Sequence, residues 1–199
     1  MNLLQRIYTT VYRRVWIVSK EFATHTDATA NGDFTMRYLD AKSLDAYEAF
    51  RPGQTAKAVE RMEGGSRAIL VCDGDQIVGC VWASTDRAYI PYIDRDIVLR
   101  PGEMYTHDAF THPDYRRRGV ATIRNSMLVR EYKRLGYERA AGIVAFENHV
   151  GLRSAESAGY ARVGVFACVR LGFRQLDLPG RGCEGEQKRF VSPLNRRGG

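Results

Sequence analysis

The sequence predicts a mixed α/β fold in which a largely antiparallel sheet is flanked by helices. Two apolar runs, 67–72 and 77–84, are separated by Asp73-Gly74-Asp75-Gln76, which is the pattern of a β-hairpin. Further along, strand, helix and strand patterns follow one another over 103–146. This succession is typical of one parallel crossover, so we expect a mixed sheet whose other pairs are antiparallel.

The first 33 residues are expected to form a segment that precedes the main domain. Residues 2–13 predict an amphipathic helix, because arginines lie beside an apolar face made of Leu3, Leu4, Ile7, Tyr8 and Val11. Residues 14–22 have the pattern of a strand. The polar stretch 23–33 contains the turn signal Asn31-Gly32 and is expected to be a linker.

The main domain begins with a strand, expected at 34–39, and two short helices. Asp40 or Ser43 can cap the first helix, which runs through Phe50 and stops before Pro52-Gly53. The second helix, at 55–62, ends at two glycines. The hairpin described above follows directly.

The second half of the domain opens with a segment, 85–102, that is rich in proline and aspartate and is expected to be irregular. The elements expected after it are a strand at 103–111 stopped by Pro113, a helix at 118–135, a strand at 139–146, a short helix from Asn148 to Gly159 and a strand at 160–171. We therefore divide the chain into an N-terminal segment (1–33), the main α/β domain (34–172) and a basic C-terminal extension (173–199).

Composition and charge limit the classes of protein that this chain can be. It has 199 residues, of which 44% are hydrophobic and 27% charged, which is ordinary for a globular protein and excludes collagen-like and disordered chains. No apolar run reaches the roughly 18 residues of a membrane-spanning helix. The net charge of +7 is concentrated at the two ends of the chain. Basic ends suit an anionic surface or an acidic protein, although they also serve plain solubility.

The cysteines and the N-terminus indicate a reducing compartment. Cys72, Cys80, Cys168 and Cys183 form no CxxC pair, and only four histidines accompany them, so we expect reduced thiols and no metal site. Arginines interrupt the apolar N-terminal stretch and no small-residue cleavage site follows, so no secretory signal peptide is expected. The expected location is cytoplasmic.

Residues 111–121, Thr-His-Pro-Asp-Tyr-Arg-Arg-Arg-Gly-Val-Ala, carry the most informative motif. A strand ends there, a short loop turns, and a helix begins with the pattern Arg116-x-x-Gly119-x-Ala121. Small residues at 119 and 121 let a ligand approach the backbone, and the N–H groups of the first helical turn attract anions. Together with the three arginines, they predict a site for a pyrophosphate.

This motif resembles the coenzyme A loop of the GCN5-related N-acetyltransferase (GNAT) superfamily, whose pattern is Gln/Arg-x-x-Gly-x-Gly/Ala. A strand with a proline-containing loop precedes it, and a helix of about five turns leads to an apolar strand, as in the family. Asn148 followed by Gly159-Tyr160 is similar to the family's Asn…Gly-Phe segment. The resemblance covers roughly 34–172 and implies a GNAT-like acyl-CoA N-acyltransferase fold.

The resemblance implies a binding site for acetyl-CoA, residue by residue. Backbone N–H groups of the loop would bind the pyrophosphate, and the end of the preceding strand would pair with the pantetheine arm, which Asn148 would also contact. The residues concerned are Phe110, Thr111, Arg116, Arg117, Arg118, Gly119, Val120, Ala121 and Asn148. The side chain of Asn148 is equally suited to cap a helix.

The catalytic groups are less clearly indicated. Family members often carry a histidine or glutamate general base on the strand at 103–111, where His107 is the first candidate and Tyr105 and Glu103 are the others. An imidazole that titrates near pH 6–7 suits this work, and Asp108 can orient it only if a β-bulge brings both to one side. Ala155 stands where the family often has a tyrosine proton donor; a thiol has a pKa near 8.5, so water can protonate the leaving group.

The expected function is therefore that of an acyl-CoA-dependent N-acyltransferase, transferring acetyl from acetyl-CoA to a primary amine of a small molecule or peptide by direct attack. Two alternatives stay open. One is a longer-chain acyltransferase that docks an acidic acyl carrier protein through its basic ends. The other is a non-catalytic domain that binds acyl-CoA. No pattern indicates the acceptor or the oligomeric state.

Overall fold

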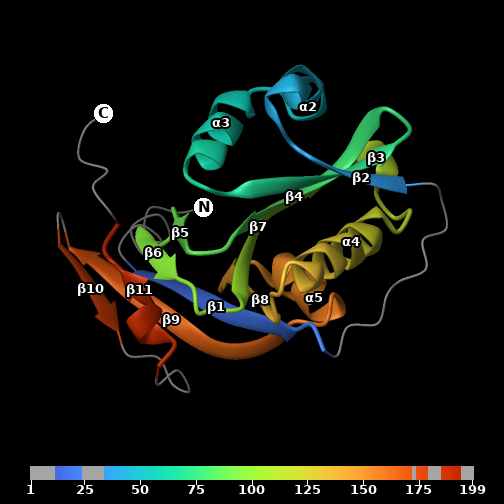
Figure 1. The fold of residues 1–199 in the computed structure, drawn as a ribbon. Helices are drawn as coiled ribbons and strands as arrows, with labels where there is room; N and C mark the ends of the chain where they lie inside the picture. Colours follow the sequence, from blue (N-terminus) through green and yellow to red (C-terminus); the bar gives the residue numbers. More distant parts are fainter. Residues whose placement is uncertain (1–11, 24–33, 172–173, 179–184, 194–199) are drawn as a thin grey trace. The chain divides into compact units, whose positions relative to one another are not determined.

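Figure 1 shows the strands and helices of the computed structural model, which describes residues 12–23, 34–171, 174–178 and 185–193. The chain divides into two units, each formed by segments that are distant in sequence. We call Glu21–Thr85 with Pro101–Ala140 the motif unit, because it contains the motif at 111–121. We call Met1–Lys20, Asp86–Arg100 and Ala141–Gly199 the terminal unit. The predicted amphipathic helix and Cys183 lie outside the described residues.

The motif unit is built on four antiparallel strands in the order β7-β4-β3-β2. Their bounds are β2 (Phe34–Tyr38), β3 (Arg67–Asp73), β4 (Gln76–Ser84) and β7 (Glu103–Thr111). The predicted hairpin is confirmed, with Asp73 paired to Gln76 across a two-residue turn. Gly74 begins this turn at φ 56°, a left-handed conformation that glycine adopts without steric cost.

Helices cover the two faces of this sheet (Figure 1). A 3-10 helix η1 (Ala41–Ser43), α2 (Leu44–Phe50) and α3 (Thr55–Glu63) contribute to one face, and α4 (Val120–Arg134) lies on the other. As predicted, Asp40 caps the first of them, because Asp40 and Ser43 exchange side-chain-to-backbone hydrogen bonds in a capping box. The predicted mixed α/β fold, with a largely antiparallel sheet flanked by helices, is thus confirmed.

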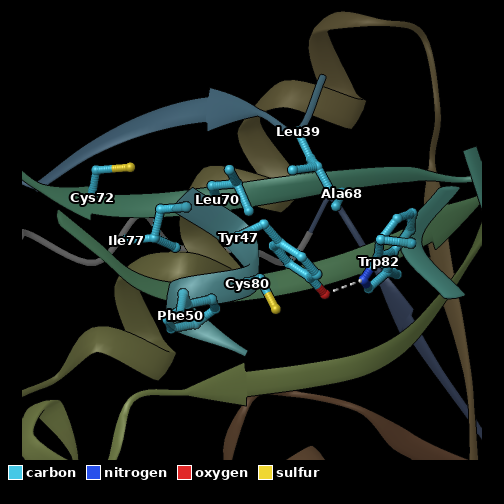
Figure 2. Packing of buried hydrophobic residues seen from close by; sticks show 10 residues of the cluster. Leu39, Tyr47, Phe50, Ala68, Leu70, Cys72, Ile77, Cys80 and Trp82 are labelled. Atoms are coloured by element: carbon cyan, nitrogen blue, oxygen red, sulfur yellow. Dashed lines mark hydrogen bonds between the residues drawn. The ribbon is translucent and has the colours of Figure 1, made fainter. Parts of the chain in front are cut away.

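Each face of the sheet has its own apolar core. Figure 2 shows the core under α2 and α3, where the Trp82 indole N–H donates to the Tyr47 hydroxyl at 3.3 Å and the two rings meet edge to face. The opposite core lies under α4 and contains Val71, Val78, Val120, Ile123 and Met127. Because side chains alternate along a strand, β3 and β4 supply both cores, and this explains why their apolar runs are nearly continuous.

The terminal unit contains the strand order β10-β9-β1-β8 and a separate small sheet, β11-β6-β5. The elements are β1 (Tyr12–Glu21), β5 (Arg87–Ile90), β6 (Arg95–Val98), β8 (Arg139–Ala145), α5 (His149–Ser157), β9 (Ala161–Leu171), β10 (Arg174–Leu178), η3 (Gln187–Arg189) and β11 (Phe190–Val191). Strand β9 pairs antiparallel with both β1 and β10.

Two expectations about this part of the chain are corrected, and the structure adds two strands about which no expectation was stated. The segment 85–102 is not irregular, since β5 and β6 pair antiparallel in it and Pro91 lies in the turn between them. Strand β1 begins two residues earlier than expected, at Tyr12. Two short strands, β10 and β11, occur within 173–199, where they pair with β9 and β6. The division of the chain at 33 and 172 stays a prediction.

One glycine determines how closely α4 approaches the sheet. A Cβ atom at Gly79 in β4 would lie 3.1 Å from a methyl group of Val120, the first residue of α4, and 3.5 Å from the Phe110 carbonyl oxygen. Real Cβ atoms seldom come so close to other heavy atoms. Gly79 therefore lets the start of α4 lie directly against β4 and the end of β7.

We expect Gly79→Val to destabilise the protein by about 1–3 kcal/mol, because the added methyl groups overpack the contact with Val120. Gly79→Ala should cost less. Urea unfolding followed by circular dichroism measures both changes. Unchanged unfolding midpoints in both variants would show that the contact is not tight.

Candidate active site

A loop at residues 112–121, here called the arginine loop, carries the chain from the end of β7 into α4. The side chain of His112 caps a short 3-10 helix, η2 (Pro113–Tyr115), and α4 begins at Val120. Between these two helices, Arg117 at φ 62° and Gly119 at φ 77° have left-handed backbones. At a non-glycine residue this conformation costs about 1–2 kcal/mol, so the turn has a defined and locally strained shape.

The loop is open where α4 begins. Gly119 is the N-cap residue without a side-chain hydrogen bond, and a Cβ atom placed there would meet nothing within 4 Å. The residues around it are exposed, including Arg116, Arg117, Arg118 and Ala121, whereas Val120 is buried. The first N–H groups of a helix lack intrahelical partners and the helix dipole favours negative charge there, so this end of α4 fits phosphate groups.

Tyr115 anchors the loop to the β3–β4 turn. Its hydroxyl lies 3.1 Å from an Asp73 carboxylate oxygen and 3.3 Å from the Gln76 amide oxygen. The guanidinium of Arg118 lies over the Tyr115 ring at 5.2 Å, which is within the roughly 6 Å limit of a cation–π interaction. The position of the arginine loop therefore depends on the hairpin as well as on α4.

The end of β7 is held by a buried arginine that sequence reasoning missed. Arg124, in the second turn of α4, donates from Nη1 to the Phe110 carbonyl oxygen at 3.0 Å and to the Thr111 hydroxyl at 3.1 Å. Its side chain is only 7% exposed. The signal in the sequence was its spacing, since Arg124 lies four positions after Val120 and four before Leu128, on the apolar face of the helix.

A β-bulge in β7 rearranges the residues near its end. Trp82 is opposite His107, but Cys80 is opposite Phe110, so β7 contains one residue more than β4 over this interval. Asp108, at φ 47°, lies within the bulge. Since residues opposite one another share a face, the bulge brings His107 and Phe110 to the same side of the sheet.

His107 is packed between aromatic rings under α2 and α3. Its ring stacks on Tyr105 at 5.4 Å and on Trp82 at 6.4 Å, and its Nε2 lies 3.4 Å from the Ser84 hydroxyl. Burial, and then the positive charge of Arg61, lower its pKa from 6.5 to about 4. The expectation of an imidazole titrating near pH 6–7 is therefore wrong. The ring is neutral at neutral pH and is a weak base.

Asp108 pairs with arginines rather than with His107. The Arg51 Nη1 lies 3.0 Å from Asp108 Oδ2, and the Arg61 Nη1 contacts the same oxygen. Burial alone would raise the pKa of Asp108, but hydrogen bonds from the two guanidinium groups outweigh it and lower the pKa below its ordinary value. The β-bulge on which an orienting role of Asp108 depended is present, but the carboxylate pairs with the two guanidinium groups instead.

The other two candidates on β7 are more deeply buried than His107. Tyr105 is 5% exposed, and burial raises the pKa of its phenol, which stays protonated in the neutral range. Glu103, at the start of the strand, is 2% exposed.

Asn148 has the capping role expected of it. Its side chain accepts a hydrogen bond from the Gly151 N–H at 2.9 Å at the start of α5. Asn148 and Ala155 belong to the terminal unit, whereas the other candidate residues belong to the motif unit. Within the motif unit, the structure groups the arginine loop with Phe110 and Thr111 through Arg124, and His107 with Tyr105.

We expect Arg124→Met to lower stability by about 1–3 kcal/mol, because it removes the hydrogen bonds from Arg124 to the partly buried Phe110 carbonyl and to the Thr111 hydroxyl. It should also weaken acetyl-CoA binding, since the strand end loses its link to α4. Arg130→Met, an exposed arginine on the same helix, is the matched control and should change neither property. Urea unfolding and calorimetry measure the two effects. If Arg124→Met and Arg130→Met have the same stability and the same affinity for acetyl-CoA, Arg124 does not position the end of β7.

The buried imidazole also predicts a pH dependence of stability. The pKa of His107 is about 4 in the folded chain, compared with the ordinary 6.5. As the pH falls below 6.5, the unfolded chain binds the proton before the folded chain does, and this lowers the stability of the folded state. The wild type should lose stability relative to His107→Gln between about pH 6.5 and about pH 4, and show no such relative loss above pH 6.5. Unfolding free energies measured for both proteins across this range test it. Parallel curves would contradict the lowered pKa.

Comparison with known proteins agrees with this geometry. The model of the acetyltransferase (GNAT) family matches residues 32–160. No curated protein matches the sequence significantly. Among solved structures, similar folds include a Drosophila protein, the aminoglycoside N-acetyltransferase AAC(6')-Iy with a CoA-linked bisubstrate analogue, and a GCN5-related N-acetyltransferase from Sphaerobacter thermophilus.

The identities to these structures are low, so the likeness is one of fold. The Drosophila protein has a TM-score of 0.55 and 12% identity, over 88% of this chain and 54% of that one. The aminoglycoside enzyme has values of 0.52 and 16%, over 72% and 97%. The Sphaerobacter protein has a TM-score of 0.52 and 15% identity, over 80% of this chain and 52% of that one. This chain therefore spans about half the length of the Drosophila and Sphaerobacter proteins. Because the family model matches more than half of the sequence, the chain belongs to the acetyltransferase (GNAT) family.

Proposed function

We propose that this protein is an acyl-CoA-dependent N-acyltransferase that transfers acetyl from acetyl-CoA to a primary amine. The observation that carries the proposal is the arginine loop, where exposed arginines surround an uncapped helix start with open space at Gly119. Family membership implies N-acyltransferase activity in general. A structural neighbour has been solved with CoA bound, which supports a CoA-type ligand.

The residues of the motif unit fit the parts of this ligand. The N–H groups at the start of α4 and the side chains of Arg116, Arg117 and Arg118 would hold the pyrophosphate. Phe110 and Thr111, fixed by Arg124, would pair with the pantetheine arm. A contact from Asn148, which belongs to the terminal unit, stays a prediction from the family resemblance. When bound, acetyl-CoA supplies the acyl group as a thioester.

The chain's own groups have a limited part in moving protons. The neutral His107 can accept a hydrogen bond, but with a pKa of about 4 it is too weak a base to deprotonate more than a small fraction of an ammonium group. The unprotonated fraction of the amine therefore attacks the thioester, and the proton that its nitrogen loses afterwards passes to the solvent. Ala155 supplies no acid, and the departing thiolate takes a proton from water. The protein then accelerates the reaction mostly by holding the two substrates in the correct positions.

Among the described residues, no helix is both long and apolar enough to cross a bilayer. Donation of a longer chain by an acyl carrier protein stays a prediction from the basic ends of the sequence. The described structure adds no observation that favours it over acetyl-CoA.

A charge-matched pair of substitutions at Gly119 tests the proposal. Asparagine and aspartate both tolerate a left-handed backbone and have nearly the same shape, but only aspartate repels a pyrophosphate. We expect Gly119→Asn to bind acetyl-CoA within about tenfold of the wild type, and Gly119→Asp to bind at least tenfold more weakly than Gly119→Asn.

Calorimetry with acetyl-CoA gives the affinities, and release of free thiol in the presence of a panel of amines gives the activity. Circular dichroism establishes that both variants are folded. Equal affinity of the two variants would place the pyrophosphate elsewhere. Tight binding of acetyl-CoA by the wild type without thiol release from any amine would leave a binding domain and sink the enzymatic proposal.

A further inference from the structure

Two arginines share one carboxylate of β7 on the face of the sheet that α2 and α3 cover. Arg51 ends α2 and Arg61 lies in α3, yet both guanidinium groups reach Asp108 Oδ2. One carboxylate neutralises only one of the two permanent charges. The cluster of Arg51, Arg61 and Asp108 therefore has a net charge of +1.

The arginines have donors to spare for a ligand. A guanidinium has five N–H donors, and in each residue a single nitrogen, Nη1, makes the contact with Asp108. The side chains of Arg51, Arg61 and Asp108 are 13%, 17% and 24% exposed, so each of them is partly exposed to solvent. A second anion can thus be bound without displacing Asp108.

The surroundings strengthen the attraction for an anion. The Arg51 guanidinium lies over the Phe110 ring at 4.8 Å and that of Arg61 over the Trp82 ring at 5.0 Å. These rings exclude water from one side of each cation, which strengthens its interactions with other charges. Lys57 adds positive potential, since it contributes with Arg61 to the lowered pKa of His107.

The cluster lies next to the residues that the proposed reaction uses. Asp108 directly follows His107 in β7, and Phe110, under Arg51, is one of the two residues assigned to the pantetheine arm. A strand advances about 3.3 Å per residue, so Asp108 is about 7 Å along the strand from Phe110. A small acceptor is long enough to span this distance between Asp108 and Phe110.

We propose that Arg51 and Arg61 bind a carboxylate of the acceptor, and that the acceptor is an α-amino acid. This inference rests on the proposed N-acyltransferase function and adds the class of substrate. In an α-amino acid, one carbon carries the amine and the carboxylate, so the carboxylate can bind the arginines while the amine stays beside Asp108 and His107. A polyamine lacks the anion and is repelled by the net positive charge.

The test compares amines that differ only in the carboxylate. Thiol release from acetyl-CoA is measured with each common L-amino acid, with its amide and with its decarboxylated amine. We expect the best amino acid to exceed its amide and its decarboxylated amine in kcat/KM by about 10- to 100-fold, the size of a charge-assisted interaction.

Variants then assign the effect to the arginines. Arg51→Gln and Arg61→Gln should each lower kcat/KM for the amino acid by about tenfold or more, chiefly through KM, and leave that for the decarboxylated amine within about threefold. Arg61→Lys should retain more than Arg61→Gln because it keeps the charge. Arg67→Gln, an exposed arginine of β3, is the control and should change neither substrate.

The outcomes separate this inference from the proposed function. Thiol release that is equal or faster with amides, decarboxylated amines, polyamines or peptides overturns the amino acid assignment and leaves the N-acyltransferase intact. An amino acid preference that survives both glutamine variants, in protein shown to be folded by circular dichroism, also overturns it. Absence of thiol release with every amine overturns the proposed function and the inference with it.

Discussion

An extra residue in β7 is the constraint on which the candidate active site depends. Without the bulge at Asp108, strict alternation would place His107 and Phe110 on opposite faces of the sheet. The left-handed backbone of Asp108 costs about 1–3 kcal/mol. Its contacts with Arg51 and Arg61 are charge-assisted, worth about 1.5–3 kcal/mol each when well formed, and so offset this strain. The bulge and the two helices that carry the arginines thus depend on one another.

Burial fixes the protonation states along this face. The pKa of His107 is lowered to about 4, that of Tyr105 is raised, and that of Asp108 is lowered, the first two chiefly by burial. Burial likewise raises the pKa of the Cys80 thiol beneath them. None of these groups changes charge between mildly acidic and mildly alkaline pH. The face therefore presents a constant electrostatic environment, in which permanent cations rather than titrating groups determine what binds.

Local patterns made much of the fold predictable from sequence. The hairpin, β7 and α4 were placed within two residues, because turn chemistry, alternation and helical periodicity are properties of short segments. Strands β5 and β6 were missed because Pro91, a turn residue in the structure, suggested an irregular segment. The arginine loop was recognisable for the same reason as the hairpin. The partners of Asp108, the burial of Arg124 and the low pKa of His107 were not, since each depends on residues brought from elsewhere in the chain.

The left-handed turn at Arg117 and Gly119 has a consequence for the history of this sequence. The site that we propose at this turn would bind its ligand through main-chain amides, so it would place few demands on the side chains as long as the backbone keeps its path. Substitutions can then accumulate at most positions while a few small or turn-forming residues are retained. Identities of 12–16% between this chain and structures of the same fold are what such backbone recognition permits. In such a site, the path of the main chain can therefore stay similar after most side chains have changed.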